Sequence, residues 1–241
     1  DLRSATVTTT AADYEPVIDR EIAELFMLNA DDPIKTHVMG LVHDWWASAP
    51  ESAIDQYADN LRALPGADAF LDERYLPPVI TLADLDECAE GTLGHAYRHW
   101  IVDNGLEPNL ARNQHEYFHK LLDAGRLDRM PDDVKYAFLR GFMLHDYLHT
   151  ITGFGPDVPG ELGMAGFHHA QLRTTYHAMR IAVTTAHVAF VNPRFIATTM
   201  DAISNGWIMG QSWKNLHFTK WEEELDRPLA DIRAEYGPGG A

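Results

Sequence analysis

Apolar positions along this chain recur every three or four residues, whereas runs of alternating polar and apolar residues are rare. The three-to-four spacing is typical of amphipathic α-helices, because an α-helix has about 3.6 residues per turn. We therefore expect an all-α protein, a single-domain multi-helix bundle with long central helices. The expected helices cover residues 16–28, 34–49, 52–64, about 94–102, 113–123, about 131–150, about 160–190, about 193–214 and 221–236.

Prolines and glycines set the expected boundaries of these helices. An irregular segment is expected at residues 65–86, around Pro77 and Pro78. Pro131 and the two aspartates after it favour a helix start, because proline fits the first turn and acids suit the positive end of the helix dipole. The stretch 150–160 contains three glycines and two prolines. We expect it to end one helix and turn the chain back before the next begins.

Length and composition fit one domain. The chain has 241 residues and 46% hydrophobic composition, which suffices to bury a core. We expect residues 1–14 to form a flexible N-terminal tail and residues 15–241 to form a single helical domain, with a motif-bearing core at 90–237. No window reaches the roughly 18 uninterrupted apolar residues that span a bilayer. We therefore expect a cytoplasmic protein that is peripherally associated with the inner face of a membrane.

Charge and cysteine content exclude several classes of function. The formal net charge of −17 argues against nucleic acid as a partner, because no basic surface would neutralise phosphates. Any contact with a membrane should accordingly be apolar. The one cysteine, Cys88, excludes an intramolecular disulfide framework and a zinc site made of cysteines.

The most informative motif is His145-Asp146-Tyr147-Leu148-His149, followed after eleven residues by Glu161. On a helix, His145, Asp146 and His149 share one arc of surface. The chain reversal at 150–160 then allows Glu161 to face them. Two imidazoles and two carboxylates suit zinc, and also iron(II) or manganese. We predict these four residues as metal ligands, and Asp146, His149 and Glu161 as catalytic residues. The alternative is that the histidines are core residues and the acids are helix caps.

A second motif lies upstream, where His115-Glu116-Tyr117-Phe118-His119 has the H-E-x-x-H pattern of zinc proteases. The further ligands of the metzincins are absent, since Leu122 and Gly125 stand at the positions of a glycine and a histidine. A zinc metallohydrolase that uses His115, Glu116 and His119 is therefore kept as an alternative. The two motifs could also form a dinuclear carboxylate site, with an additional acid from Glu21, Glu24 or Asp44.

The helix expected after Glu161 has a face that begins polar and becomes apolar. A face of this kind is typical of a plain core helix, but beside a groove it could bind an apolar tail. The predicted substrate-binding residues on this face are His168, Leu172, Tyr176 and Met179. In the following helix, Gly206 and Gly210 permit a close approach to another helix.

These motifs resemble the coenzyme Q (ubiquinone) biosynthesis protein four family, whose signature is H-D-x-x-H, eleven residues and then E. The sequence matches it without a gap at His145, Asp146, His149 and Glu161. Agreement extends from about residue 60 to 237. It includes residues 90–97, 160–162, 220–223 and 228–235.

The resemblance implies an all-helical, metal-binding protein that handles a polyprenylated aromatic ring in ubiquinone biosynthesis. It implies oxidative removal of the ring carboxylate at C1, which leaves a hydroxyl group there. A divalent metal, with zinc favoured over iron(II) or manganese, would be the cofactor. The expected partners are a prenylated aromatic or isoprenoid lipid, other quinone-biosynthesis proteins and a second copy of the chain in a homodimer. A non-catalytic scaffold that binds prenyl lipids is the other alternative.

Overall fold

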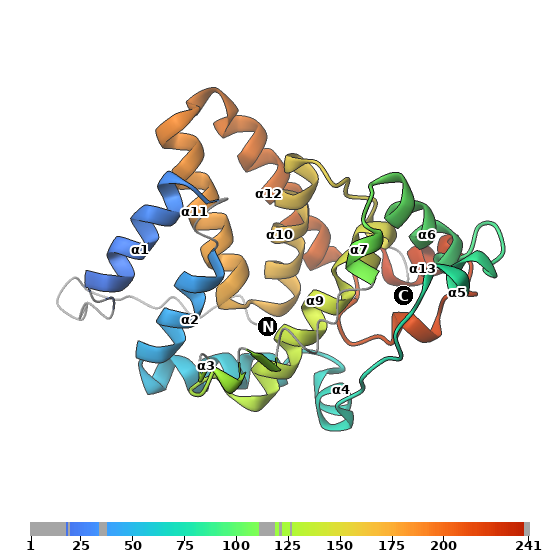
Figure 1. Ribbon diagram of the computed structural model, residues 1–241, viewed down its shortest axis with the longest axis horizontal. Helices are drawn as coiled ribbons and strands as arrows, with labels where there is room; N and C mark the ends of the chain where they lie inside the picture. Colours follow the sequence, from blue (N-terminus) through green and yellow to red (C-terminus); the bar gives the residue numbers. More distant parts are fainter. Residues whose placement is uncertain are drawn as a thin grey trace.

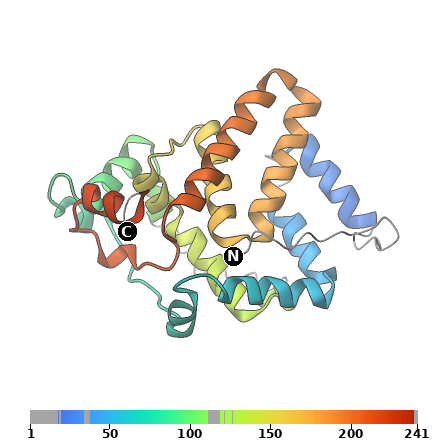
Figure 2. The same cartoon turned by 180° about the vertical axis from the view of Figure 1, so that it is seen from behind.

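The helices of this protein pack around one long central helix in a computed structural model (Figures 1 and 2). The structure describes residues 18, 20–33, 38–110, 119–120, 122–125 and 127–238, without the side chains of residues 108 and 109. These residues form helices and contain no β-strand, which confirms the all-α fold class. The helices are α1 (Arg20–Asp31), α2 (Val38–Ser48), α3 (Glu51–Arg62), α4 (Ala67–Glu73), α5 (Leu82–Asp86), α6 (Leu93–Asp103), α7 (Glu107–Leu110), α9 (Asp132–Thr152), α10 (Val158–Leu172), α11 (Thr175–Val191), α12 (Ile196–Ser212) and α13 (Leu229–Tyr236), with short 3-10 helices η2 (Pro193–Phe195) and η3 (Trp221–Glu223).

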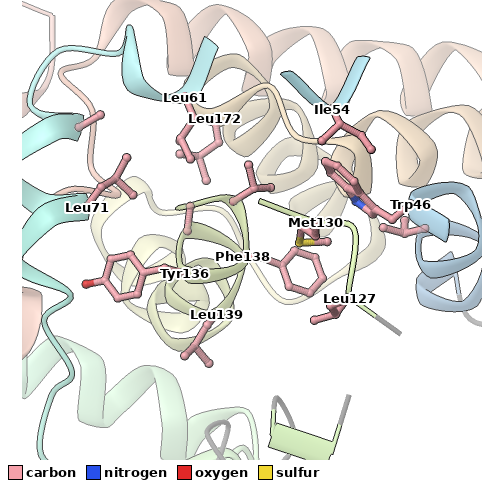
Figure 3. Packing of buried hydrophobic residues seen from close by; sticks show 14 of the residues in the cluster. Trp46, Ile54, Leu61, Leu71, Leu127, Met130, Tyr136, Phe138, Leu139 and Leu172 are labelled. Atoms are coloured by element: carbon pink, nitrogen blue, oxygen red, sulfur yellow. The ribbon is translucent and has the colours of Figure 1, made fainter. Parts of the chain in front are cut away.

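The central helix α9 contributes to two hydrophobic clusters. Its first half packs with α2, α3 and α4, where Trp46, Leu61 and Leu71 belong to the same hydrophobic cluster as Phe138 (Figure 3). Its second half packs with α6 and with the C-terminal segment after α12 (residues 213–238) through Leu144 and Leu148. Burial of apolar surface on both halves holds α9 in place. The last turns of α9 therefore project into the middle of the molecule.

Helices α10 and α12 approach each other so closely that only glycine fits at their contact. A methyl group on Gly206 would lie 1.8 Å from the carbonyl oxygen of Gly163, and one on Gly166 would lie 2.3 Å from the carbonyl oxygen of Ile203. A methyl group on Gly210 would lie 2.7 Å from the carbonyl oxygen of Phe167 in α10. This confirms the close approach expected from Gly206 and Gly210. It also fixes the position of α10, which carries Glu161.

The C-terminal segment contacts α9 through a buried ion pair and through partly buried hydrogen bonds. Arg140 donates two hydrogen bonds, of 2.8 and 3.1 Å, to the carboxylate of Glu222, and both side chains are almost fully buried. Arg233 donates to the carbonyl oxygens of Thr150 and Ile151 at the end of α9. These contacts satisfy backbone groups that a helix end leaves unpaired. They also bring residues 213–217 beside α10.

Several expected boundaries were wrong. The helix expected at 160–190 is interrupted, because Arg173 takes a left-handed conformation (φ 54°) and α11 runs back beside α10. Arginine rarely adopts this conformation, so the sequence contained no signal for the turn. The irregular segment expected at 65–86 contains α4 and α5, and the helix expected at 221–236 is divided into η3 and α13. The tail at 1–14 lies outside the described residues.

In the part of the chain that the structure describes, no helix combines the length and apolar character needed to cross a bilayer.

Candidate metal centre

The turn between α9 and α10 brings the residues of the main motif together. Helix α9 ends at Gly153, whose φ of +83° lies in the left-handed region that favours glycine. Asp157 then begins α10 by accepting a hydrogen bond from the backbone N–H of Gly160. At Gly160 a side chain would collide with the carbonyl oxygen of Gly155. The glycines of this stretch thus permit a tight reversal that places Glu161 opposite the last turns of α9.

His145, His149 and Glu161 form a group that can hold a metal ion. One ligand atom from each residue lies within 4.8 Å of the other two. The Nε2 atom of His149 lies 3.5 Å from Glu161 Oε1, and Nε2 of His145 lies 3.7 Å from Glu161 Oε2. Two ligand atoms about 2.1 Å from one ion, at roughly tetrahedral angles, are about 3.4 Å apart. The spacing therefore fits a cation between the three side chains better than direct hydrogen bonds.

Both histidines present Nε2 to this site because their Nδ1 atoms are engaged elsewhere. Nδ1 of His149 donates to the carbonyl oxygen of Phe154 at 2.9 Å, and Nδ1 of His145 donates to Asp146 Oδ1 at 3.2 Å. Such contacts fix the tautomer that leaves Nε2 free for a metal. Nε2 of His149 is buried and has no hydrogen-bond partner among the described residues. Trp100 stacks on the His149 ring at 4.7 Å and holds its orientation.

Electrostatics in the site favour a positive charge. Loss of solvation lowers the pKa of His145, but its contacts with Asp146 and Glu161 outweigh this effect and raise the pKa to about 9. Burial raises the pKa of Glu161, but His145 and His149 outweigh it and hold the pKa well below its usual value. The carboxylate is therefore ionised and the site attracts a proton or a cation.

A cavity of about 330 Å³ adjoins the ligand group. His145, Asp146 and Glu161 line it together with apolar side chains of α9, α10 and α11. Three of the predicted substrate-binding residues, His168, Leu172 and Tyr176, also line it. The fourth, Met179, is not among its lining residues and packs instead against the hydrophobic core. The turn at Arg173 explains the difference, because α11 does not continue the face of α10.

A second cluster of histidines contributes two of its rings, His168 and His177, to the wall of the cavity. The ring of His168 is nearly parallel to the rings of His145 and His177, and its Nδ1 lies 2.6 Å from Nε2 of His217. Burial lowers the pKa of His217 to about 3, and burial followed by the neighbouring histidines lowers the pKa values of His168 and His177 well below the usual value. These rings are neutral near pH 7.

The remaining predicted ligands take other positions. Asp146 lies outside the three-residue ligand group and contacts His145 instead. Among the described residues that group is the one cluster of its kind, and it includes none of Glu21, Glu24 and Asp44. The dinuclear alternative also requires Glu116. His115 and Glu116 lie outside the described residues, and His119 is exposed.

A family model described as "Coenzyme Q (ubiquinone) biosynthesis protein Coq4" matches residues 48–238, which is well over half of the chain. This chain belongs to the Coq4 family. The ubiquinone biosynthesis protein coq4, mitochondrial, of Talaromyces stipitatus is 22% identical over 202 residues, which cover 81% of this chain and 65% of that protein. The mitochondrial COQ4 homolog of Danio rerio is 23% identical over 187 residues, 75% of this chain and 64% of that protein.

The chain thus spans just under two thirds of the length of these Coq4 relatives. A crystal structure from Nostoc punctiforme, of a protein described provisionally as a ubiquinone biosynthesis protein, has a TM-score of 0.69 and 23% identity. The match covers 90% of this chain and 95% of that one. At this identity the likeness shows a shared fold. The family assignment confirms the resemblance inferred from the H-D-x-x-H motif.

Some cavity residues of this Coq4 protein had no signal in the sequence. Tyr97 reaches the cavity from α6, and His177 and Arg180 reach it from α11. Their positions depend on the turn at Arg173 and on packing between distant segments. The high histidine content of the chain suggested contacts between histidines, but sequence spacing alone could not pair His217 with His168.

Proposed function

We propose that this protein is a metal-dependent enzyme of ubiquinone biosynthesis that acts on a polyprenylated hydroxybenzoate-type ring. The proposed reaction is oxidative decarboxylation and hydroxylation at C1. One observation carries the proposal: Nε2 of His145, Nε2 of His149 and the carboxylate of Glu161 converge beside a largely apolar cavity. Three protein ligands leave a position open for substrate, as in catalytic zinc sites.

The chain's own residues supply binding and orientation. His145, His149 and Glu161 would hold the ion, and Asp146 would orient His145 through Nδ1. A divalent ion, when bound, supplies a Lewis acid for the ring carboxylate and a neighbouring phenolate. Zinc is the favoured metal, with iron(II) or manganese as the redox-capable choices. Asp146, His149 and Glu161 are the proposed catalytic residues because they contact or orient the reacting groups.

The cavity has room for an aromatic ring rather than for a whole polyprenyl tail. Its volume of about 330 Å³ lies at the small end of the roughly 300–1,000 Å³ range of ligand pockets. Leu172, Phe138 and Phe142 supply apolar walls. The tail would therefore leave the cavity toward the surface.

The overall chemistry balances with dioxygen as the oxidant. The bond between C1 and the carboxylate breaks and carbon dioxide leaves, while a C–O bond forms at C1. Two electrons pass from the ring to dioxygen. With water as a reactant, the products are the ring hydroxyl, carbon dioxide and hydrogen peroxide.

We also propose a peripheral position on the inner face of a membrane. Helix α11 ends and α12 begins at one extremity of the molecule (Figure 2). Exposed apolar side chains are concentrated in this part of the sequence. They are Phe190, Val191, Phe195, Ile196 and Met200. With a net charge of −17, contact with lipid would be apolar rather than electrostatic. The proposed partners are the prenylated substrate and other quinone-biosynthesis proteins, and the proposed assembly is a homodimer.

The test is release of labelled carbon dioxide from a carboxyl-labelled prenylated hydroxybenzoate, with and without oxygen. We expect release that requires oxygen and metal, and that His145→Ala abolishes. His119→Ala is the matched control, because His119 is a helical histidine outside the ligand group, and it should retain activity. Metal-loaded protein that binds the ring without releasing carbon dioxide would support the scaffold function instead. Oxygen-independent cleavage of a peptide or ester that His119→Ala abolishes would support the metallohydrolase.

A further inference from the structure

The second histidine cluster determines the protonation pattern of a ring that faces the cavity. The pattern begins at Gln171, whose side chain is buried in α10. Its Nε2 lies 3.0 Å from the carbonyl oxygen of Lys214 and 3.4 Å from that of Gly210. Its Oε1 accepts the backbone N–H of Leu216 at 2.9 Å. These backbone groups admit one orientation of the amide, because carbonyls only accept and an N–H only donates.

The orientation of Gln171 sets the tautomer of His217. The same Oε1 lies 3.1 Å from Nδ1 of His217, so that Nδ1 must carry a proton and donate. A neutral imidazole has one N–H, and Nε2 of His217 is therefore an acceptor. The 2.6 Å contact with His168 follows, with Nδ1 of His168 as the donor.

The remaining nitrogen of His168 is then an acceptor without a proton. Its Nε2 is buried and has no hydrogen-bond partner among the described residues, and the side chain is 2% exposed. His168 lines the cavity beside His145 and Glu161. An unsatisfied buried acceptor costs about 1–3 kcal/mol, which a ligand that donates to it would recover.

The neighbouring His177 differs from His168, because its hydrogen-bond partner does not fix its tautomer. It also lines the cavity, but its Nδ1 pairs with the hydroxyl of Thr174 at 2.7 Å. A hydroxyl can donate or accept, so Thr174 does not determine the tautomer of His177. The fixed acceptor is therefore a property of the Gln171–His217–His168 chain.

We propose that Nε2 of His168 accepts a hydrogen bond from a hydroxyl group of the ring in the cavity, and so selects a hydroxylated ring over its methyl ether. The inference rests on the proposed function for the identity of the ring. It adds the protein atom that recognises a hydroxyl group of that ring. His168 is then a specificity-determining residue, and Gln171 and His217 are positioning residues that act through it.

Binding measurements with two ligands test the inference. A prenylated dihydroxybenzoate should bind about 10–100 times more tightly than its monomethyl ether, because the ether leaves the acceptor unpaired. His168→Phe keeps an aromatic ring but removes the acceptor, and should reduce this ratio to nearly one. His169→Phe is the matched control, since the adjacent His169 contacts Trp207 and does not line the cavity. It should keep the ratio.

Nitrogen-15 NMR of the wild-type histidines gives a readout that does not depend on a variant's folding. We expect a protonated Nδ1 and an unprotonated Nε2 in both His168 and His217. The opposite tautomer in His168, or equal binding of the two ligands, would overturn the inference and leave the proposed function standing. Failure of both rings to bind would overturn the proposed function together with it.

Discussion

Two histidine clusters lie side by side in this protein, and they differ in whether a carboxylate faces the rings. His145 and His149 face Glu161, and the pKa of His145 is raised to about 9. His168 and His217 face each other and an amide, and burial lowers the pKa of His217 to about 3. The carboxylate allows the first cluster to hold a cation, whereas burial without a carboxylate keeps the second cluster neutral.

The comparison shows that histidine content alone does not define a metal site. In the second cluster the short contact between His168 and His217 occupies one nitrogen of each ring. In the first, both Nδ1 atoms donate to fixed oxygens and both Nε2 atoms point toward one carboxylate. We infer that the first cluster holds the cofactor and the second recognises the substrate.

The largest expected effect comes from removing the carboxylate. Glu161→Gln keeps the size of the side chain but removes the charge that attracts the cation, and we expect metal affinity to fall at least 100-fold. His217→Gln, in the second cluster, should keep the metal. Elemental analysis after dialysis measures both variants. Equal metal content in the two variants would contradict metal binding by the first cluster alone.

Loss of the buried ion pair should weaken the attachment of the second cluster. Glu222→Gln leaves the charge of Arg140 unpaired in the interior and should destabilise the protein by about 3 kcal/mol. Denaturant unfolding measures the change. Glu224→Gln is the control, because Glu224 and Arg227 form a partly exposed pair worth about 0–1 kcal/mol. Similar losses for both variants would contradict this role of Glu222.

A smaller effect is expected from the residue that orients His145. Asp146→Asn keeps an acceptor near Nδ1 but removes its charge, and should weaken metal binding about 10–100-fold. Isothermal titration with zinc gives the affinity. Asp132→Asn, at the exposed start of α9, should leave it unchanged. A complete loss of metal in Asp146→Asn would instead identify Asp146 as a ligand.

The smallest effect concerns pH. Because the pKa of His217 falls from 6.5 to about 3 on folding, the unfolded chain binds a proton that the folded chain does not between these values. Stability should therefore fall as the pH is lowered through this window, by up to about 1.4 kcal/mol per pH unit for this group. In the presence of a chelator, the free energy of unfolding of His217→Gln should depend less steeply on pH between pH 4 and 6 than that of the wild type. Above pH 7.5 the pH dependence of the wild type and of the variant should agree. The same pH dependence of both proteins between pH 4 and 6 as well would contradict a neutral His217.

The sequence allowed the helical class and the convergence of His145, His149 and Glu161 to be predicted, because both depend on local spacing. His145 and His149 are four apart on one helix, and the glycines before Glu161 signal a reversal. The second cluster could not be predicted. It depends on a left-handed Arg173 and on contacts between residues far apart in the sequence, such as Gln171 with Leu216.

Anomalous diffraction from crystals of the metal-loaded protein tests the central claim most directly. We predict one strong peak about 2.0–2.2 Å from Nε2 of His145, Nε2 of His149 and a carboxylate oxygen of Glu161. A peak between His168 and His217, or a metal bound elsewhere with these three side chains unliganded, would contradict the account.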